Sequence, residues 1–234
     1  MPPASLPGEL TRRRRLFAFG VVLSVSFLHF VVSSFYYLLR GAHQPDPSQL
    51  QFRLLGALVA ESTSLLVLWY VLAEQRRTWN DIGWNPAGRD ILRGAGLLIA
   101  TVIAIYPPVF CFQLLYRLFA AHYLEARSMR GLLGFGVSAL SIAFVLLNPF
   151  FEELIVRAYT MSEVVGLGGS RTLAVLVSVA IQMSYNLYQG LLNGVVLVVT
   201  FTVFSIYYAK ARRIAPVILA HFCFDAYALL SRSL

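Results

Sequence analysis

The chain is poor in charge for its length. Asp, Glu, Lys and Arg make up 13% of its 234 residues, about half of the fraction that is usual in a soluble domain. Hydrophobic residues make up 58% of the sequence. They gather in runs that reach the roughly 20 apolar residues needed to cross a bilayer as a helix. This balance excludes a soluble enzyme or a soluble binding module.

The sequence also has few cysteines, and its apolar runs show no alternation of apolar and polar residues. The two cysteines, Cys111 and Cys223, fall inside apolar runs. We therefore expect free buried thiols and no disulfide framework. The runs do not alternate between apolar and polar residues, which excludes a transmembrane β-barrel. No basic stretch is interleaved with aromatic residues, so we expect no nucleic-acid partner.

What the sequence has instead is a series of long apolar segments. They predict an all-α fold, a polytopic integral membrane helical bundle with about seven transmembrane helices, in a range of roughly six to eight. The predicted spans are 17–39, 54–73, 94–119, 133–150, 172–189, 191–209 and 214–230. Residues 1–11 hold three prolines and predict a disordered tail. We assign 12–131 to N-terminal transmembrane helices with an interfacial loop, and 132–234 to a core that carries the motifs below.

Much of the net charge of +8 lies in short basic clusters beside the predicted spans. These clusters are Arg12–Arg15, Arg76 with Arg77, and Lys210 with Arg212 and Arg213. By the positive-inside rule, all three indicate the cytoplasmic side rather than a patch for an anionic ligand. We therefore expect the N-terminus in the cytoplasm and the protein in the plasma membrane of a bacterial cell.

Two adjacent acids interrupt one of the most apolar stretches of the chain, FVLLNPFFEELIVRAY. A charge in such a segment is costly, and its presence is by default a hypothesis of function. Glu153 and Arg157 are four residues apart, share a helix face and can form an ion pair. Glu152 points about 100° away around the helix and is the freer carboxylate. Geometry alone equally allows a purely structural ion cluster.

Two further polar pairs lie in the last spans. Gln182 and Asn186 are four residues apart, so their amides share a face. His221 and Asp225 have the same spacing, and the carboxylate can fix the tautomer of the imidazole. Hydrogen bonding between helices is the competing interpretation of the amide pair, and a histidine that only packs within the bundle is the competing interpretation of the second pair. Glu61, inside the second span, is not explained by any motif, although its serine and threonine neighbours can solvate it.

The motifs resemble those of a known family of intramembrane proteases. EELIVR matches EExxxR and AHFCFD matches HxxxN/D, in the right order and on membrane helices. Over about residues 137–230, the chain is similar to the CAAX-protease and bacteriocin-processing family (CPBP, also called Abi), including CAAX prenyl protease 2-like enzymes. The family's intermediate motif, FxxxH, has its best counterpart at Gln182 to Asn186, where both named positions differ.

The resemblance implies an intramembrane endopeptidase that hydrolyses a peptide bond of a protein or peptide substrate at the membrane. It implies Glu152 as the group that activates water and His221 with Asp225 as the pair that polarises the carbonyl. Asn186 stands where a second water-activating histidine is expected. Because an asparagine cannot take up a proton at neutral pH, the alternative is a catalytically weak or inactive pseudoprotease that binds a partner in the membrane.

The resemblance leaves the cofactor open. A divalent metal such as zinc would have Glu152 and His221 as ligands and Asn186 as a weak third, fewer good ligands than the three of a catalytic zinc. The partners that we expect are the lipid bilayer and a protein or peptide substrate. A small transporter with Glu61, Glu152 and His221 as a proton relay is a third interpretation. The sequence selects neither a substrate nor an oligomeric state.

Overall fold

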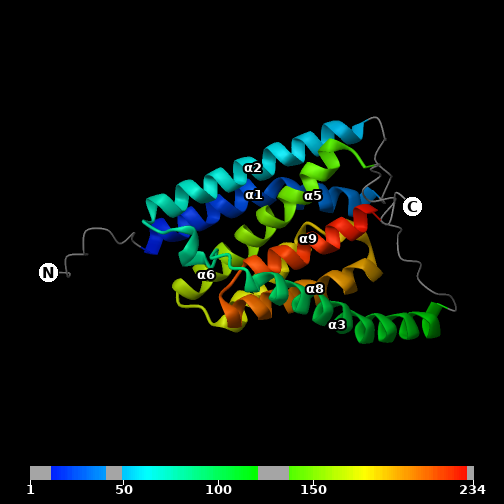
Figure 1. The fold of residues 1–234 in the computed structure, drawn as a ribbon. Helices are drawn as coiled ribbons and strands as arrows, with labels where there is room; N and C mark the ends of the chain where they lie inside the picture. The colour runs from blue at the N-terminus through cyan, green and yellow to red at the C-terminus, as the bar shows by residue number, and fades with distance from the viewer. Residues whose placement is uncertain (1–11, 41–48, 121–136, 231–234) are drawn as a thin grey trace.

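The computed structural model describes residues 12–40, 49–120 and 137–230, and these residues form helices with no strand among them (Figure 1). The elements are α1 (Arg12–Arg40), α2 (Leu50–Glu74), η2 (Trp79–Ile82), α3 (Arg89–Ala120), α5 (Ala139–Glu152), η3 (Glu153–Tyr159), α6 (Thr160–Gly166), α7 (Arg171–Ser184), η4 (Leu187–Gln189), α8 (Leu191–Ala211) and α9 (Ala215–Leu230). The predicted all-α fold is confirmed. The predicted disordered tail, 1–11, lies outside the described residues.

Among the described residues, five helical segments are long and apolar enough to cross a membrane, namely Arg12–Leu39, Gln51–Glu74, Arg89–Phe119, Ala139–Gly166 and Leu191–Ala211. Two shorter apolar helices, Arg171–Ser184 and Ala215–Leu230, complete the set. The protein is therefore an integral membrane helical bundle. The predicted span 172–189 is wrong at its end, because the chain turns after Ser184 and Gly190 adopts a positive φ of 88°.

The helix that carries the two adjacent acids continues much further than its sequence suggested. The predicted span 133–150 starts outside the described residues, and its end is wrong, because α5 runs on through η3 and α6 to Gly166. η3 is a π-helix that begins at Glu153, and π-helical turns are frequent at functional sites. Glu152 consequently lies roughly 20 Å from the Gly166 end, near the middle of the segment rather than at its boundary.

The packing of α5 against α9 brings the two sequence motifs together. α1 and α2 lie side by side along one flank of the bundle, and α3, α8 and α9 lie on the other (Figure 1). α5 passes between these flanks and contacts both α2 and α9. The fold thus places the helix of Glu152 at the centre, where residues from several helices can reach it.

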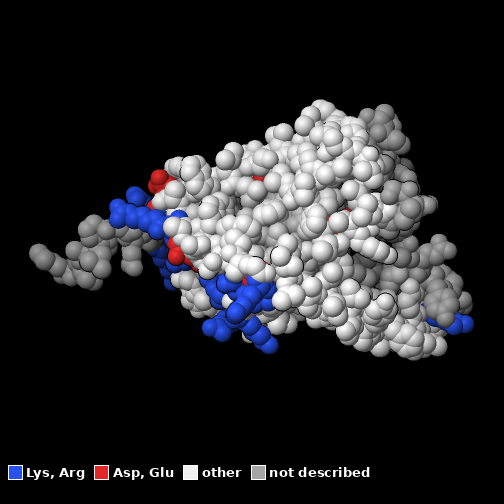
Figure 2. All heavy atoms as spheres, viewed as in Figure 1, with Lys and Arg blue, Asp and Glu red and all other residues white. Residues whose placement is uncertain are grey.

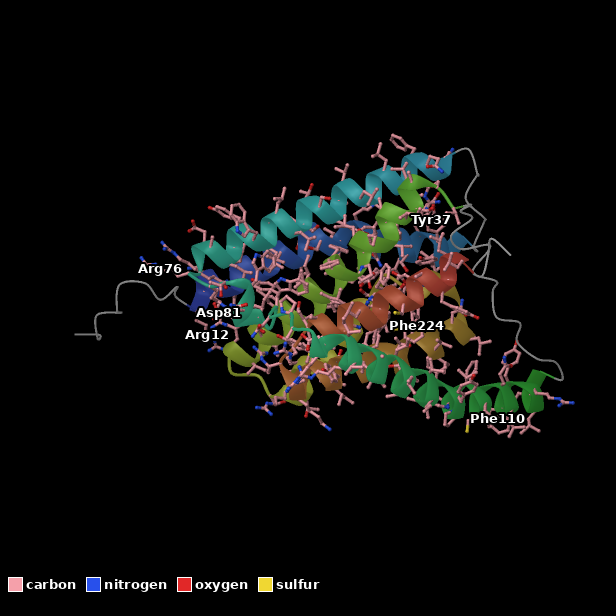
Figure 3. The ribbon with its side chains drawn as sticks, viewed as in Figure 1. Arg12, Tyr37, Arg76, Asp81, Phe110 and Phe224 are labelled. Carbon is pink, nitrogen blue, oxygen red and sulfur yellow. The ribbon has the colours of Figure 1, made fainter. Side chains whose placement is uncertain are left out.

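The basic clusters gather at one end of the bundle (Figure 2). There Glu163, fully buried on α6, binds Arg15 of α1, with Nε 2.7 Å from Oε2, and also binds Arg77, which follows α2. Arg213, which follows α8, pairs with Asp90 of α3 at 2.7 Å. Figure 3 labels Arg12, Arg76 and Asp81 at this end and Phe110 towards the far end of α3. The clusters predicted to share one side of the membrane therefore share one end of the molecule.

The loop between α2 and α3 docks onto the turn between α8 and α9. The backbone N–H of Ile214 donates to the carbonyl of Gly83 at 3.0 Å. Gly83 has a φ of 84°, and a Cβ there would lie 2.6 Å from the carbonyl oxygen of Arg212, so only glycine fits. Nearby, the backbone N–H and hydroxyl of Thr78 donate to Asp81 and lower the pKa of that carboxyl. The loop fixes the start of α9, the helix that carries His221.

Cys111 and Cys223 are both free and both exposed. The prediction of free thiols is confirmed, but the prediction that they are buried is wrong. In a membrane bundle an apolar helix face can point towards lipid instead of a protein core, so an apolar run alone does not place a side chain inside.

Candidate active site

Glu152 and Glu153 have separate environments. Glu153 is 0% exposed, and its Oε1 accepts a hydrogen bond from Nη1 of Arg157 at 2.7 Å. The guanidinium of Arg157 also lies over the rings of Phe201 and Phe204, 5.2 and 5.5 Å from their centres, which favours the cation further. Glu152 keeps 9% of its surface exposed. The predicted ion pair is present, and the other acid retains access.

His221 joins the two acids. Its Nδ1 lies 2.6 Å from Oε1 of Glu153, so the imidazole donates through Nδ1 and the carboxylate accepts. This contact turns Nε2 towards Oε2 of Glu152, at 3.9 Å, and towards Oδ1 of Asp225, at 3.7 Å. The sequence assigned Asp225 the task of fixing the imidazole tautomer. In the structure its distance is too long for a hydrogen bond, and Glu153 makes that contact.

Asp225 is held from α5. Nδ2 of Asn148 donates to its Oδ2 at 3.3 Å. Sequence reasoning missed Asn148, although a signal was available: it precedes Glu152 by four residues and so shares its helix face. Asn148 and Glu152 therefore present two polar side chains from one helix towards α9.

The amide that reaches Glu152 belongs to Gln182, and not to Asn186. Nε2 of Gln182 donates to Oε2 of Glu152. The amide of Asn186 donates to the backbone carbonyl of Gln182 at 2.8 Å, and its Oδ1 accepts from Gln189 at 2.5 Å. Asn186 stands at the position of the expected histidine, and its side chain is thus hydrogen-bonded within its own segment. The i, i+4 spacing had marked both amides but could not say which one meets the acid.

Three side chains could hold a metal ion at this place. Glu152, Glu153 and His221 each offer a ligand atom, and these atoms lie within 4.8 Å of one another. Oε1 of Glu153 accepts from Arg157 and from Nδ1 of His221, whereas its Oε2 has no hydrogen-bond partner among the described residues. The Asn186 amide is bonded elsewhere. A zinc ion would therefore share Glu153 with the buried guanidinium of Arg157.

Glu152 and His221 form an acceptor and a polariser that face one another. Their 3.9 Å separation, from Oε2 to Nε2, lets a single water or carbonyl oxygen contact both groups. A carboxylate can take a proton from such a water, and an imidazole N–H can donate to a developing negative oxygen. The arrangement can support attack of water on a carbonyl group.

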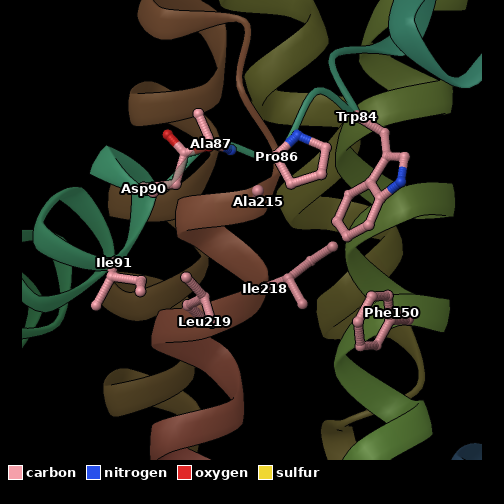
Figure 4. A pocket seen from close by; sticks show the side chains of 10 residues that line it. Trp84, Pro86, Ala87, Asp90, Ile91, Phe150, Ala215, Ile218 and Leu219 are labelled. Carbon is pink, nitrogen blue, oxygen red and sulfur yellow. The ribbon is translucent and has the colours of Figure 1, made fainter.

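A mostly apolar cavity, with Asp90 in its wall, lies between α3, α5 and α9 (Figure 4). It has a volume of about 330 Å³. Phe150 and Ile218 line it and come from α5 and α9, the helices of Glu152 and His221, while Trp84 closes one side from the loop that follows η2. A Cβ added to Gly88, which also lines the cavity, would meet nothing within 4 Å. The cavity can receive an apolar group between the two helices that carry Glu152 and His221.

Comparison with protein families identifies the region that carries these residues. Residues 134–227 match the family model described as type II CAAX prenyl endopeptidase, Rce1-like. The match includes Glu152, Asn186, His221 and Asp225, and excludes α1 and α2. No curated protein and no solved structure matches the chain. The resemblance to the CAAX-protease family is therefore confirmed over the segment that holds both motifs.

Proposed function

Because residues 134–227 match the model of the Rce1-like type II CAAX prenyl endopeptidases, we propose that this protein is an intramembrane endopeptidase that hydrolyses a peptide bond of a protein or peptide substrate. The observation that carries the proposal is the pair of Glu152 and His221. They face one another across 3.9 Å, inside the bundle, on two helices of the matched segment. Hydrolysis needs a group that accepts a proton from water and a group that stabilises the oxyanion, and this pair supplies both.

In the first step Glu152 accepts a proton from a water molecule, and the water oxygen bonds to the carbonyl carbon of the substrate. The hydrogen bond from Gln182 holds the Glu152 carboxylate in place. In the second step the carbon–nitrogen bond breaks and the leaving amine takes up one proton. Water is consumed and an acid and an amine are formed, so that atoms and charge balance.

His221 stabilises the negative oxygen that forms between these steps. Its Nδ1 donates to Glu153, so only a proton on Nε2 can be offered to the substrate. Removing one oxyanion donor typically costs about 10²–10³ in rate. Asp225, held by Asn148 at 3.3 Å, supports the positive charge of the doubly protonated imidazole from the side of Nε2.

The apolar cavity between α3, α5 and α9 receives an apolar part of the substrate. Its walls, Phe150 and Ile218, lie within one helical turn of Glu152 and His221 along their helices. A prenylated peptide, the substrate class that the family description implies, carries such a group. An apolar pocket beside a few convergent polar groups is the usual form of a ligand site.

The basic end of the bundle faces the cytoplasm in this proposal. Arg15, Arg77 and Arg213 lie at that end, and cytoplasmic loops are rich in Lys and Arg. The N-terminus then lies inside the cell, and the protein is a resident of the plasma membrane. Its partners are the bilayer and the peptide substrate.

The test uses the full chain in liposomes with a panel of peptides, each with and without a prenyl group. We expect cleavage of at least one peptide by the wild type and loss of cleavage in Glu152→Gln. Glu74→Gln is the matched control, because Glu74 is an exposed acid at the end of α2, and it should cleave at the wild-type rate. Cleavage that survives Glu152→Gln contradicts the proposal.

A second candidate function is favoured by one observation, the state of Asn186. Its amide is bonded within its own segment and cannot serve as a base. The protein would then bind a peptide or a lipid-modified tail in the membrane without cutting it. Asn186→His separates the two functions: cleavage that arises only in this variant supports the binding protein, and cleavage by the wild type contradicts it.

A further inference from the structure

Glu61 is a buried acid that the two motifs do not include. It lies on α2, outside the segment that matches the family, and is 1% exposed. Its Oε2 has no hydrogen-bond partner among the described residues. A buried carboxyl inside an apolar helix is costly and marks a functional site by default.

Two contacts between α2 and the segment of α5 and α6 show which residue of α5 lies at the same height as Glu61. Nε2 of Gln51 on α2 lies 3.5 Å from Oγ of Ser138, which caps α5, and Arg77 after α2 binds Glu163 on α6. These pairs are 87 and 86 residues apart, so α2 runs parallel to the helical segment of α5 and α6 with a nearly constant offset. Applying that offset places Glu61 level with Asn148.

Asn148 is the residue that holds Asp225 at 3.3 Å, one helical turn from Glu152. Because α2 packs against α5, this register places Glu61 on a neighbouring helix at the level of the candidate site.

The environment of Glu61 differs from that of the other buried glutamates. Glu153 is paired with Arg157, and Glu163 is paired with two arginines. In the part of the chain that the structure describes, Glu61 forms no ion pair with a lysine or an arginine. Without a cation beside it, a buried carboxyl is not fixed as an anion. It can therefore hold a proton, donate it and accept it again.

We propose that Glu61 is the second proton-transferring carboxyl of the site and takes the place of the histidine that this chain lacks at position 186. The inference rests on the proposed endopeptidase function. Glu152 accepts a proton from water as the carbon–oxygen bond forms, and Glu61 gives its proton to the leaving nitrogen as the carbon–nitrogen bond breaks. The proton on Glu152 then passes to Glu61, which restores both groups.

This assignment explains how a site with Asn186 can turn over. Asn186 cannot carry a proton, and Glu152 alone would have to serve as both base and acid. A second carboxyl from α2 separates the two tasks, as paired acids do in other hydrolases. Because it comes from outside the matched segment, a motif scan cannot find it.

The test compares four proteins in liposomes with a cleaved peptide: wild type, Glu61→Gln, Glu61→Gln/Asn186→His, and Ser64→Ala. Ser64 is the matched control, because it is equally buried on α2 and its hydroxyl donates to the carbonyl of Ala60 within the same helix. We expect Glu61→Gln to lower kcat roughly 10²-fold, to leave KM near the wild-type value, and to remove one limb of the pH profile of kcat. Adding Asn186→His should restore part of kcat, and Ser64→Ala should match the wild type.

Two results would overturn the assignment. The first is a wild-type kcat and pH profile in Glu61→Gln. The second is a loss of kcat that Asn186→His does not relieve and that comes with a lower unfolding midpoint, which is the mark of a structural role. A wild type without any turnover contradicts the proposed function itself, whereas an active wild type with an unaffected Glu61→Gln contradicts only the role of Glu61.

Discussion

Oε1 of Glu153 lies 2.6 Å from Nδ1 of His221 and 2.7 Å from Nη1 of Arg157. One carboxylate oxygen therefore joins the two sequence motifs and compensates a buried cation at the same time. The second glutamate of EELIVR is not a spare copy of the first. It orients the imidazole while it forms a fully buried ion pair with the arginine.

The buried ion pair of Glu153 and Arg157 predicts that removing one charge destabilises the fold and that removing both charges restores most of the stability. Glu153→Gln leaves the guanidinium of Arg157 buried without a carboxylate, which we expect to cost about 3–5 kcal/mol. Glu153→Gln/Arg157→Met removes both charges and should recover most of that loss. The measurement is the free energy of unfolding in detergent. A single variant as stable as the wild type would contradict the prediction.

A double variant without any acceptor, Glu153→Leu/Arg157→Met, separates stability from catalysis. His221 then loses the acceptor of its Nδ1–H, which a glutamine carbonyl could still supply, so kcat should stay low even though no buried charge is left unpaired. Cleavage of the peptide panel by the purified double variant provides the measurement. Recovery of kcat along with stability would mean that Glu153 has no part in orienting the imidazole.

Gln182 and Asn186 should differ in their effect on the rate. Gln182→Leu removes the donor to Glu152, and loss of a hydrogen bond to a charged group costs about 1.5–3 kcal/mol, or roughly 10- to 100-fold in kcat. Asn186→Ala removes bonds made only within its own segment and should cost less. Parallel kcat measurements on the two variants decide the order. The opposite order would show that the position of the expected histidine still acts on the reaction.

Metal chelation should leave the activity unchanged. Oε1 of Glu153 is bonded to Arg157 and to His221, and the buried positive charge of Arg157 beside this carboxylate disfavours a second cation there. The assay is peptide cleavage by the full chain after extended treatment with a strong chelator, with a known zinc protease as the positive control. Loss of cleavage that added zinc restores would show that these side chains rearrange around an ion.

Filling the apolar cavity should weaken substrate binding. Gly88 lines the cavity, and an added Cβ meets nothing within 4 Å, so Gly88→Leu adds an apolar side chain at the edge of the cavity without a backbone clash. We expect KM to rise roughly tenfold, which corresponds to about 1.4 kcal/mol of binding, with a small change in kcat. Steady-state kinetics on a prenylated peptide test this.

Gly96→Leu is the matched control for that variant. Gly96 is on α3, also has open space around an added Cβ, and does not line the cavity. Its KM should equal that of the wild type. An equal rise in both variants would assign the effect to the surface of α3 rather than to the cavity.

The fold could be predicted from the sequence because apolar length is a strong signal in a membrane protein. The predicted apolar segments correspond to the helices of the bundle. The continuation of α5 past Glu153 was missed, because charged residues end an apolar run even when the helix goes on. A π-helical turn has no signature in hydropathy, and its start at Glu153 depends on packing.

The candidate site could be predicted only in part. Spacing within one helix pointed to the pair of Glu153 and Arg157, and motif order pointed to Glu152 and His221. Contacts between helices could not be read in this way. The bond from Gln182 to Glu152 joins residues 30 positions apart, and the bond from Asn148 to Asp225 spans 77. A single sequence carries no direct signal for such pairs.

Glu163 ties the helical segment of Glu152 to two earlier parts of the chain. Its two cations, Arg15 and Arg77, come from α1 and from the residues after α2, and both lie outside the segment that matches the family model. A fragment that holds only the matched segment would leave the fully buried carboxylate of Glu163 without either cation. The motifs therefore mark the candidate site but do not mark all of the chain that holds its helices together.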